Sequence, residues 1–375
     1  MDHKSRRILI FSTAYLPFIG GAELALKEIT DRIKDIDFDL ISGRIDKTLP
    51  KQEKIGNVRI FRVGGTRNII LPKNTYPIYA FLKAVQLSKR GRYDAVFALQ
   101  ASQGGGAAWL FKLFHPKIPF ILNMQEGKDL EHQNFLIKFF RGLIIKKADL
   151  ITVLSIYLES YVKKIVPKKQ VEIIPNGVDL NKFSISNFQF PRNKDKKIII
   201  TVSRLVKKNG VGDLIDAFNI LYTKYQIQNT KLLVIGSGEL EKKLKAQTKM
   251  LGLENSVSFL GEIHHEELPK YLGQADVFVR PSLSEGLGIA FLEAMASGLP
   301  VIATAQGGIV DFLENEKTGL FCNVNDPKDL SDKIMKVLSD NVLAKAMAEK
   351  ARKLMEDKYD WDKIANRYKQ IFVSI

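Results

Sequence analysis

Short apolar runs alternate with longer segments of helical pattern along the whole chain. In the first half these runs lie at residues 8–12, 38–42, 58–62, 95–98, 120–124, 150–154 and 171–174. In the second half they lie at residues 198–202, 231–235, 257–260, 277–280 and 301–303. Because strands that alternate with helices form parallel sheets covered on both faces, the pattern predicts an α/β protein.

A polar segment at residues 181–197 separates the two series of strands and helices. The segment is rich in Asn and Lys, and Pro191 interrupts it, as is typical of a linker. A chain of 375 residues, of which 45% are hydrophobic, can bury two sizeable cores. We therefore expect two domains of related architecture, without an internal sequence repeat.

Cysteine content and the N-terminal sequence bear on where the protein works. The lone Cys322 excludes an intramolecular disulfide and fits a reducing cytoplasm, and we expect its thiol to pack in a core. Lys4, Arg6 and Arg7 precede an apolar run, as in a signal peptide, but Pro17 and polar residues interrupt that run early. We interpret it as a buried first strand. No run approaches the ~18 apolar residues of a membrane span, so we expect a cytoplasmic protein.

Two carboxylates, Glu285 and Glu293, stand eight positions apart in the segment 284–300. Gly286 and Gly288 let backbone N–H groups approach a ligand, and the helix start behind them offers further donors to a phosphate. Carboxylates accept hydrogen bonds from hydroxyls. A ligand with both sugar hydroxyls and phosphate, such as a nucleotide sugar, fits this arrangement. The alternative is an amphipathic helix whose solvated first turn favours Glu in any case.

Four further motifs accompany this E-x7-E segment in order along the second half. They are TVSRLVKKNG at 201–210, GLPVIAT at 298–304, GGIVD at 307–311 and TGLF at 318–321. Together the five motifs resemble the retaining glycosyltransferases of family 4, also called glycosyl transferases group 1. The resemblance covers most of residues 198–375.

The resemblance implies the GT-B fold, in which two Rossmann-like domains with doubly wound parallel sheets face a central cleft. Residues 1–185 would bind the acceptor, residues 186–358 would bind the nucleotide sugar, and a C-terminal helix at 359–375 would cross back to the first domain. The implied reaction moves a hexose or N-acetylhexosamine, with retention, from a UDP- or GDP-linked donor to a hydroxyl of a glycan or lipid-linked acceptor.

The segment 201–210 resembles the part of the family that grips the donor diphosphate. Arg204 supplies planar paired donors and Lys208 a mobile point charge, both suited to a departing phosphate. In the family pattern the lysine stands five residues after the arginine, and Asn209 holds that position here. We therefore expect Lys208 to reach from a shifted loop or to share the role with Asn209. The alternative is a solvated basic pair.

The resemblance gives the two carboxylates different roles, Glu285 orienting the hydroxyls of the donor sugar and Glu293 holding the ribose. It implies front-face attack by the acceptor hydroxyl, whose proton passes to the leaving diphosphate. A double displacement with Glu285 as nucleophile, as in retaining glycosidases, stays open. Backbone groups would read the base and bind the phosphate or sugar, at Gly261, Ile263, Gly286, Leu287, Gly288 and Ile289.

Two loops of the first domain are candidates for the sugar side of the site. Gly20 and Gly21 follow the first strand and open a helix, so their N–H groups can face a phosphate or the sugar, although a plain tight turn has the same sequence. After the strand at 120–124 many relatives carry a His, whereas this chain has Gln125 and Glu126. We expect one of these two to face the transferred sugar, with Asp129 assisting.

We expect no cofactor and no required metal ion, because Arg204, Lys208 and helix N–H groups can neutralise the diphosphate. The D-x-D pattern at 35–39 binds manganese in another glycosyltransferase fold, but here it begins a predicted strand, away from the ligand-binding edge. His264 and His265 are adjacent, point different ways and lack metal-ligand spacing.

Positive charge is concentrated in the first half. Residues 1–190 carry 30 basic and 17 acidic side chains, whereas residues 191–375 carry 27 and 24. This balance fits an anionic acceptor or an anionic membrane surface, and no nucleic-acid motif is present. Segments 76–92 and 135–147 mix aromatic, aliphatic and basic residues as interfacial helices do, although a core helix with solvated lysines has the same composition. We expect a peripheral enzyme on the inner face of the cell membrane, with contacts from Lys83, Lys89, Arg90, Lys138, Arg141, Lys146 and Lys147.

Two other classes of function stay open. UDP-sugar 2-epimerases share the architecture and bind UDP-sugar, but they lack this E-x7-E context. A non-catalytic sugar-nucleotide-binding subunit is consistent with the missing His, whereas Glu285, Glu293 and Arg204 favour an active enzyme.

Overall fold

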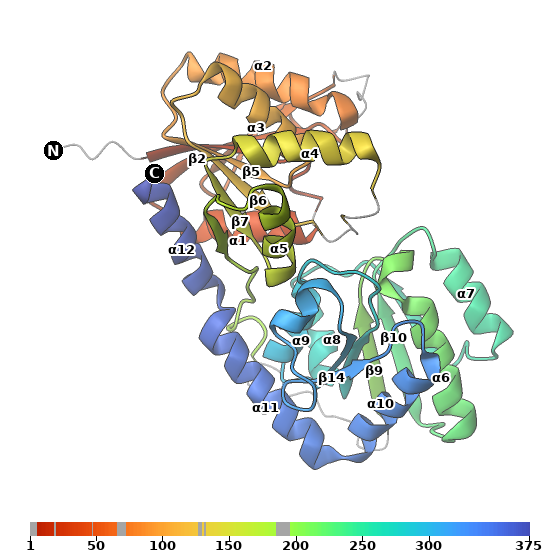
Figure 1. The fold of residues 1–375 in the computed structure, drawn as a ribbon. Helices are drawn as coiled ribbons and strands as arrows, with labels where there is room; N and C mark the ends of the chain where they lie inside the picture. The colour runs from red at the N-terminus through yellow and green to blue at the C-terminus, as the bar shows by residue number, and fades with distance from the viewer. Residues whose placement is uncertain are drawn as a thin grey trace. The chain divides into compact units, whose positions relative to one another are not determined.

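The computed structural model of the chain describes residues 6–18, 20–46, 48–65, 73–126, 130, 133–184 and 196–375. The chain forms two compact units, drawn as ribbons in Figure 1. The first unit contains residues 1–176 and 361–375, and the second contains residues 177–360. The sequence-based boundaries were 185/186 and 358/359, of which the first falls outside the described residues.

The first unit is built on an eight-stranded sheet in the order β3-β4-β2-β1-β5-β6-β7-β8. Neighbouring strands are parallel except β3 and β4. Every residue of β5, β6 and β7 is buried, as expected for a parallel sheet covered on both faces. The strands are β1 (Arg6–Phe11), β2 (Ile36–Gly43), β3 (Gln52–Ile55), β4 (Val58–Val63), β5 (Ala95–Leu99), β6 (Phe120–Met124), β7 (Leu150–Val153) and β8 (Val171–Ile173).

Helices cover both faces of this sheet. Figure 1 shows α2, α3 and α4 on one face and α1 and α12 on the other. Although α12 follows the second unit in sequence, Tyr368 and Phe372 place their ring centroids 5.8 and 5.4 Å from that of Phe97 in the core of the first. The helices are α1 (Gly21–Arg32), α2 (Tyr76–Ser88), α3 (Gln103–Phe114), α4 (Phe135–Lys147), α5 (Ile156–Ile165) and α12 (Trp361–Ser374).

Strand β3 was missed by the sequence pattern. Its residues QEKI alternate between exposed and half-buried positions, so they give no apolar signal. Gly56 and Asn57 join β3 to the antiparallel β4, and Gly56 has a φ of +58°. A Gly-Asn pair between two strands is a hairpin signal, and it was the available clue.

The second unit has a six-stranded, wholly parallel sheet in the order β11-β10-β9-β12-β13-β14. Side chains from α6 and α10 pack with its strands into one core. The strands are β9 (Lys197–Val202), β10 (Thr230–Ile235), β11 (Val257–Gly261), β12 (Val277–Arg280), β13 (Val301–Thr304) and β14 (Leu320–Cys322). The helices are α6 (Val211–Lys224), α7 (Glu241–Met250), α8 (Leu268–Gln274), α9 (Ile289–Ala296), α10 (Pro327–Ser339) and α11 (Asn341–Lys358). No helix in the described part of the chain is long and apolar enough to cross a bilayer.

Candidate functional site

The order of strands in the second unit reverses between β9 and β12, so the loops after these two strands flank the topological switch point. Ligands of open parallel sheets bind at this place. The backbone N–H of Leu283 donates to the carbonyl of Lys208 at 2.7 Å, which joins the two loops. A Cβ on Gly210, whose φ is +67°, would stand 2.1 Å from the carbonyl oxygen of Pro281. The two loops are therefore packed against each other, and Gly210 permits it.

Glu285, the first carboxylate of the pair, is buried beside Arg280, the last residue of β12. Arg280 Nη2 donates to Glu285 Oε2, and Arg280 Nε donates to Ser282 Oγ at 3.0 Å. The N–H of Gly286 donates to Glu285 Oε1 at 3.1 Å, and Lys208 Nζ lies 3.9 Å from the same oxygen. Both oxygens of Glu285 are thus held by positively charged or N–H groups.

Positive charge exceeds negative charge in this cluster. Burial and, to a smaller extent, the charge of the neighbouring Arg204 together lower the pKa of Arg280 to about 10, so the guanidinium stays protonated near neutral pH. Arg204 is exposed and Lys208 is half-buried. Arg280 and Lys208 at Glu285, with the charge of Arg204 acting on Arg280, leave a surplus of positive charge, which suits an anionic ligand.

Asn209 does not join Lys208 at Glu285. Its side chain is buried, and Nδ2 donates to the carbonyl of Arg204 at 2.7 Å, which closes the loop on itself. Lys208, one residue earlier, is the cation of this loop whose Nζ lies near Glu285. Asn209 therefore stabilises the backbone of the loop that carries Arg204.

The backbone of Glu285 is fixed by the loop after β13. The N–H of Gly308 donates to the carbonyl of Glu285 at 3.1 Å. A Cβ on Gly307, whose φ is +59°, would stand 1.9 Å from that same carbonyl oxygen. Only glycine at position 307 is compatible with both this approach and this φ. Gly288 caps the start of α9, and Leu287 is buried in the core.

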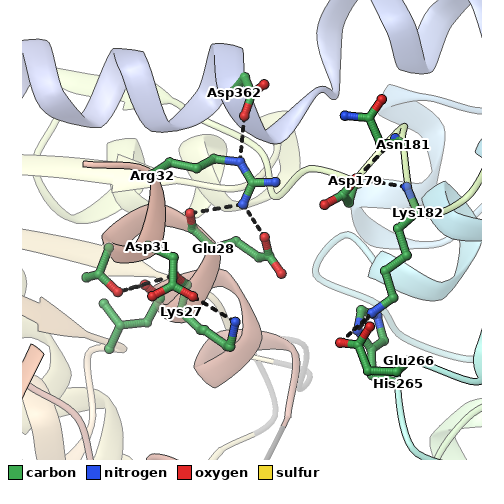
Figure 2. Close-up of polar contacts among 12 residues, drawn as sticks. Lys27, Glu28, Asp31, Arg32, Asp179, Asn181, Lys182, His265, Glu266 and Asp362 are labelled. Carbon is green, nitrogen blue, oxygen red and sulfur yellow. Dashed lines mark hydrogen bonds and ion pairs between the residues drawn. The ribbon is translucent and has the colours of Figure 1, made fainter. Parts of the chain in front are cut away.

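Glu293, the second carboxylate, lies in α9 and is paired with His265, which the sequence analysis considered only as a metal ligand. His265 Nε2 lies 2.5 Å from Glu293 Oε1, and Lys182 Nζ lies 2.8 Å from His265 Nδ1. Figure 2 shows Lys182 meeting both His265 and Glu266, whose Oε1 is 3.0 Å from the ammonium. Because a lysine ammonium can only donate, His265 Nδ1 accepts and Nε2–H donates to Glu293.

Lys182 is positioned by the turn that precedes it. Asp179 Oδ1 accepts hydrogen bonds from the backbone N–H groups of Asn181 at 3.1 Å and Lys182 at 3.0 Å (Figure 2). The clue to His265 was its place in the loop after β11, at the ligand-binding edge of the sheet. The same loop carries Gly261, with a φ of +68°, and the half-buried Ile263.

In the first unit, Gly20 and Gly21 stand at the start of α1 as expected from sequence. The N–H of Gly20 already donates to Glu23 Oε2 at 2.9 Å. A phosphate at this helix start would compete with the carboxylate of Glu23 for that donor. Residue 19 lies outside the described residues.

Gln125 and Glu126 follow β6 and belong to different polar contacts. Gln125 Nε2 donates to Asn123 Oδ1 at 2.7 Å, and Asn123 in turn donates to Tyr368 Oη at 2.7 Å. Glu126 is buried, and its Oε1 accepts from the N–H of Ala101 at 2.6 Å. Burial raises the pKa of Glu126, while the charge of Arg141 acts in the opposite direction. The predicted helper Asp129 lies outside the described residues.

The structure corrects the prediction that Arg141 faces a membrane. Arg141 is only 4% exposed, and its charge acts on the buried Glu126. A guanidinium taken out of water in this way cannot meet a lipid headgroup. Lys147 is half-buried, and Lys83 lies 5.0 Å from the ring centroid of Phe61. The candidates that the structure leaves exposed are Lys89, Arg90, Lys138 and Lys146.

Two other residues considered in the sequence analysis, Asp39 and Cys322, have structural roles. Asp39 of the D-x-D pattern is fully buried, and it accepts from Arg7 Nη2 at 2.9 Å, Arg59 Nε at 2.7 Å and Tyr93 Oη at 2.6 Å. Burial raises the pKa of the Cys322 thiol to about 12. Asp39 is therefore a structural ion-pair centre, and Cys322 is an unreactive core residue.

Comparison with known proteins gives the family. The model of glycosyltransferase family 4 matches residues 19–182, and that of glycosyl transferases group 1 matches residues 183–354. The uncharacterized glycosyltransferase MJ1607 of Methanocaldococcus jannaschii is 32% identical over 215 residues, which are 55% of this chain and only 54% of that relative. The N-acetyl-alpha-D-glucosaminyl L-malate synthase of Bacillus anthracis is 26% identical over 389 residues, 98% of this chain and 97% of the relative. The chain belongs to the glycosyltransferases of family 4.

Solved structures agree on the fold. Sucrose-phosphate synthase from Thermosynechococcus elongatus superposes with a TM-score of 0.84 at 21% identity and covers 99% of this chain and 100% of that one. Anabaena Alr3699/HepE in complex with UDP-glucose gives 0.80 at 21% identity and covers 98% and 100%. The predicted GT-B fold, with its two parallel-sheet α/β domains, is confirmed.

Proposed function

We propose that the chain is a retaining glycosyltransferase that moves a hexose or N-acetylhexosamine from a UDP- or GDP-linked donor to a hydroxyl of a glycan or lipid-linked acceptor. The observation that carries the proposal is the cluster of Arg280, Glu285 and Lys208 at the switch point of the second unit. The solved HepE complexes hold UDP and UDP-glucose, and a Mycobacterium tuberculosis relative is named as GDP-mannose-dependent. A nucleotide diphosphate sugar is the ligand class common to these relatives.

Arg204 and Lys208 are the groups that we assign to the donor diphosphate. Arg204 is exposed at the ligand-binding edge, and Lys208 reaches the carboxylate of Glu285 from the same loop. Fixed positive charge stabilises the negative charge that grows on the phosphate oxygen as the glycosidic bond breaks. Because these side chains already supply that charge, the proposed reaction requires no metal ion.

Glu293 is assigned to the ribose. Its Oε1 accepts from His265 Nε2, which fixes the orientation of the carboxylate, and Oε2 is the oxygen that we assign to a ribose hydroxyl. The loop from Gly261 to Ile263, which leads to His265, is assigned to the base. These assignments place nucleoside recognition on the loops after β11 and β12.

Front-face transfer fits the surroundings of Glu285 better than a double displacement does. Its two oxygens are engaged by Arg280, by the N–H of Gly286 and by Lys208, and such contacts weaken a carboxylate as a nucleophile. We assign it to orienting the sugar hydroxyls. In the proposed step the bond from the anomeric carbon to the phosphate oxygen breaks, the bond to the acceptor oxygen forms, and the acceptor proton passes to the leaving phosphate.

The exposed face of α4 in the first unit is the evidence for the class of acceptor. Phe135 is 75% exposed, and Leu136, Ile137, Phe139 and Phe140 are each more than half exposed. Lys138 and Lys146 are exposed on the same helix. Apolar side chains beside lysines favour an anionic bilayer surface. We therefore propose a lipid-linked acceptor, or a glycan acceptor at the membrane, on the cytoplasmic face.

A panel of UDP- and GDP-sugars tests the proposal by thermal shift and by slow donor hydrolysis without acceptor. We expect one donor to stabilise the protein, and Glu285→Ala and Arg204→Ala to lose that stabilisation. Exposed Glu254→Ala and Lys353→Ala are the matched controls and should keep it. A folded protein that responds to no nucleotide sugar would contradict the proposal, and label that stays in free UDP-sugar in the presence of acceptors would favour an epimerase.

A further inference from the structure

A groove of about 480 Å³ lies between α4 and α5 of the first unit. Its walls are apolar, with Phe135, Phe139 and Leu143 from α4 and Ile165 from α5. A volume of this size is in the range of small-molecule sites in proteins. The groove is separate from the polar contacts of Gln125 and Glu126 described above.

One face of each helix forms the groove. On α4 the lining positions 135, 138, 139, 142, 143 and 146 are related by intervals of three and four, so they share one side of the helix. On α5 the lining positions 161, 164 and 165 have the same spacing. Leu136, Ile137 and Phe140 of α4 are exposed but do not line the groove. The exposed surface of α4 therefore has two parts, one that lines the groove and one formed by Leu136, Ile137 and Phe140. Substitutions can test each part by itself.

Gly142 lines the groove without a side chain. A Cβ built on this residue meets no atom within 4 Å. Glycine weakens the interior of a helix relative to alanine, and no close packing requires it here. The absence of a side chain at position 142 therefore has no structural explanation other than the space that it leaves.

Cations surround the apolar walls. Lys138, Lys146 and Lys164 all line the groove and are exposed, and Tyr161 also lines it. Among the described residues that line the groove, none is acidic. Apolar walls with three lysines complement a ligand that combines a hydrocarbon chain with an anionic headgroup.

We propose that this groove binds one anionic phospholipid molecule, with its hydrocarbon chain along Phe135, Phe139 and Ile165 and its phosphate among Lys138, Lys146 and Lys164. The inference rests on the proposed anionic membrane partner. It goes further than that proposal, because it adds a site for one lipid molecule per chain to a surface that was proposed only to associate with the bilayer. The site prefers phosphatidylglycerol to phosphatidylcholine, since a zwitterionic headgroup carries no net charge for the three lysines.

Calorimetric titration with dihexanoyl phosphatidylglycerol, below its micellar concentration, tests the groove without a bilayer. We expect saturable binding of one lipid per chain, at least tenfold tighter than that of dihexanoyl phosphatidylcholine, and no binding of inorganic phosphate. Gly142→Leu should fill the groove and weaken binding at least tenfold. Lys146→Ala and Lys164→Ala should each weaken it about fivefold, which corresponds to about 1 kcal/mol per lysine near a membrane surface.

Phe140→Ser is the matched control because Phe140 is exposed on α4 outside the groove. It should weaken sedimentation with phosphatidylglycerol vesicles and leave binding of the monomeric lipid unchanged. Circular dichroism and thermal unfolding of each variant should match those of the unmodified chain, which shows that the first unit, where all these substitutions lie, is folded.

The outcomes distinguish failure of the lipid-site proposal from failure of the membrane-surface and transferase proposals. Vesicle binding without monomeric lipid binding, or lipid binding that Gly142→Leu does not change, overturns the groove and leaves the membrane surface standing. Binding of neither vesicles nor lipid overturns both, while the donor panel still decides the transferase proposal. Equal binding of inorganic phosphate would show that the hydrocarbon chain has no part in the site.

Discussion

Arg280 donates a hydrogen bond from Nη2 to Glu285 Oε2, so the first carboxylate of the E-x7-E segment belongs to a buried ion pair. The guanidinium also lies over the ring of Phe291, 4.6 Å from its centroid. Arg280 therefore links the end of β12, the loop that carries Glu285 and the first turn of α9. We regard it as the residue that positions Glu285.

Removing Arg280 should cost more than a surface ion pair does. Arg280→Ala leaves the Glu285 carboxylate buried without its partner, and we expect a loss of about 3–5 kcal/mol in the free energy of unfolding. Urea denaturation measures it. The control is Arg352→Ala, which breaks the partly exposed contact to Glu356 and should cost about 1 kcal/mol or less. Equal losses in the two variants would show that the Arg280 pair is not buried in solution.

His265 should act on donor binding through Glu293. His265→Ala removes the hydrogen bond that orients the second carboxylate, and hydrogen bonds to charged groups contribute about 1.5–3 kcal/mol. We expect the KM for the donor to rise at least tenfold with a smaller change in kcat. His265→Gln, which retains a donor, should recover part of the affinity. Glu266→Gln touches Lys182 but not Glu293, so an equal effect of that variant would contradict the assignment.

Gly307 should tolerate no side chain. Gly307→Ala combines a φ of +59° with a Cβ 1.9 Å from the carbonyl oxygen of Glu285. Gly252→Ala is the matched control, because Gly252 has a φ of +68° but its Cβ would meet no atom within 4 Å. The control should cost about 1–2 kcal/mol for the left-handed backbone alone. We expect Gly307→Ala to exceed that cost and to abolish donor stabilisation, and equal costs would contradict the close packing at Glu285.

Glu126 should make stability depend on pH. Because burial raises its pKa, the folded chain keeps this proton where the unfolded chain has lost it. The contribution of Glu126 to stability is therefore full below the ordinary pKa of 4.5 and falls as the pH rises from there toward the folded pKa. Glu126→Gln cannot ionise but can still accept from the N–H of Ala101. Its stability relative to the unmodified chain should rise with pH from about 4 toward neutrality in urea titrations.

The control for this pH dependence is Glu316→Gln. The hydrogen bond from Lys336 lowers the pKa of the exposed Glu316. The stability of Glu316→Gln relative to the unmodified chain should therefore fall, not rise, as the pH increases. A stability difference for Glu126→Gln that does not change with pH would contradict the burial of the carboxyl.

The sequence predicted what depends on local pattern. Strand β6 occupies the predicted residues, because five consecutive apolar or small polar positions form a central parallel strand that is buried on both faces. Glu285 and Glu293 were singled out from their spacing and the glycines between them, and their roles at the site stay predictions. The strand β3 was missed, since only one of its four residues, Ile55, is apolar and packs against the core.

The sequence could not predict contacts that depend on tertiary pairing. Arg280 looks like the polar end of an apolar strand, and only the packed loop shows that it meets Glu285. His265 and Lys182 are 83 positions apart, and the fold brings them together at Glu293. Arg141 lies in a segment of surface-like composition, but the rotation of α4 turns it inward.

Proton NMR of the earliest product from an α-linked nucleotide sugar tests the central claim most directly. The account predicts that the first sugar product formed, whether by transfer or by slow hydrolysis, has the α configuration, and that Arg204→Ala and Glu285→Ala form it far more slowly. A β-configured first product would contradict retention. Failure to release any sugar from UDP- or GDP-linked donors by the folded protein would contradict the assignment of the second unit as the donor site.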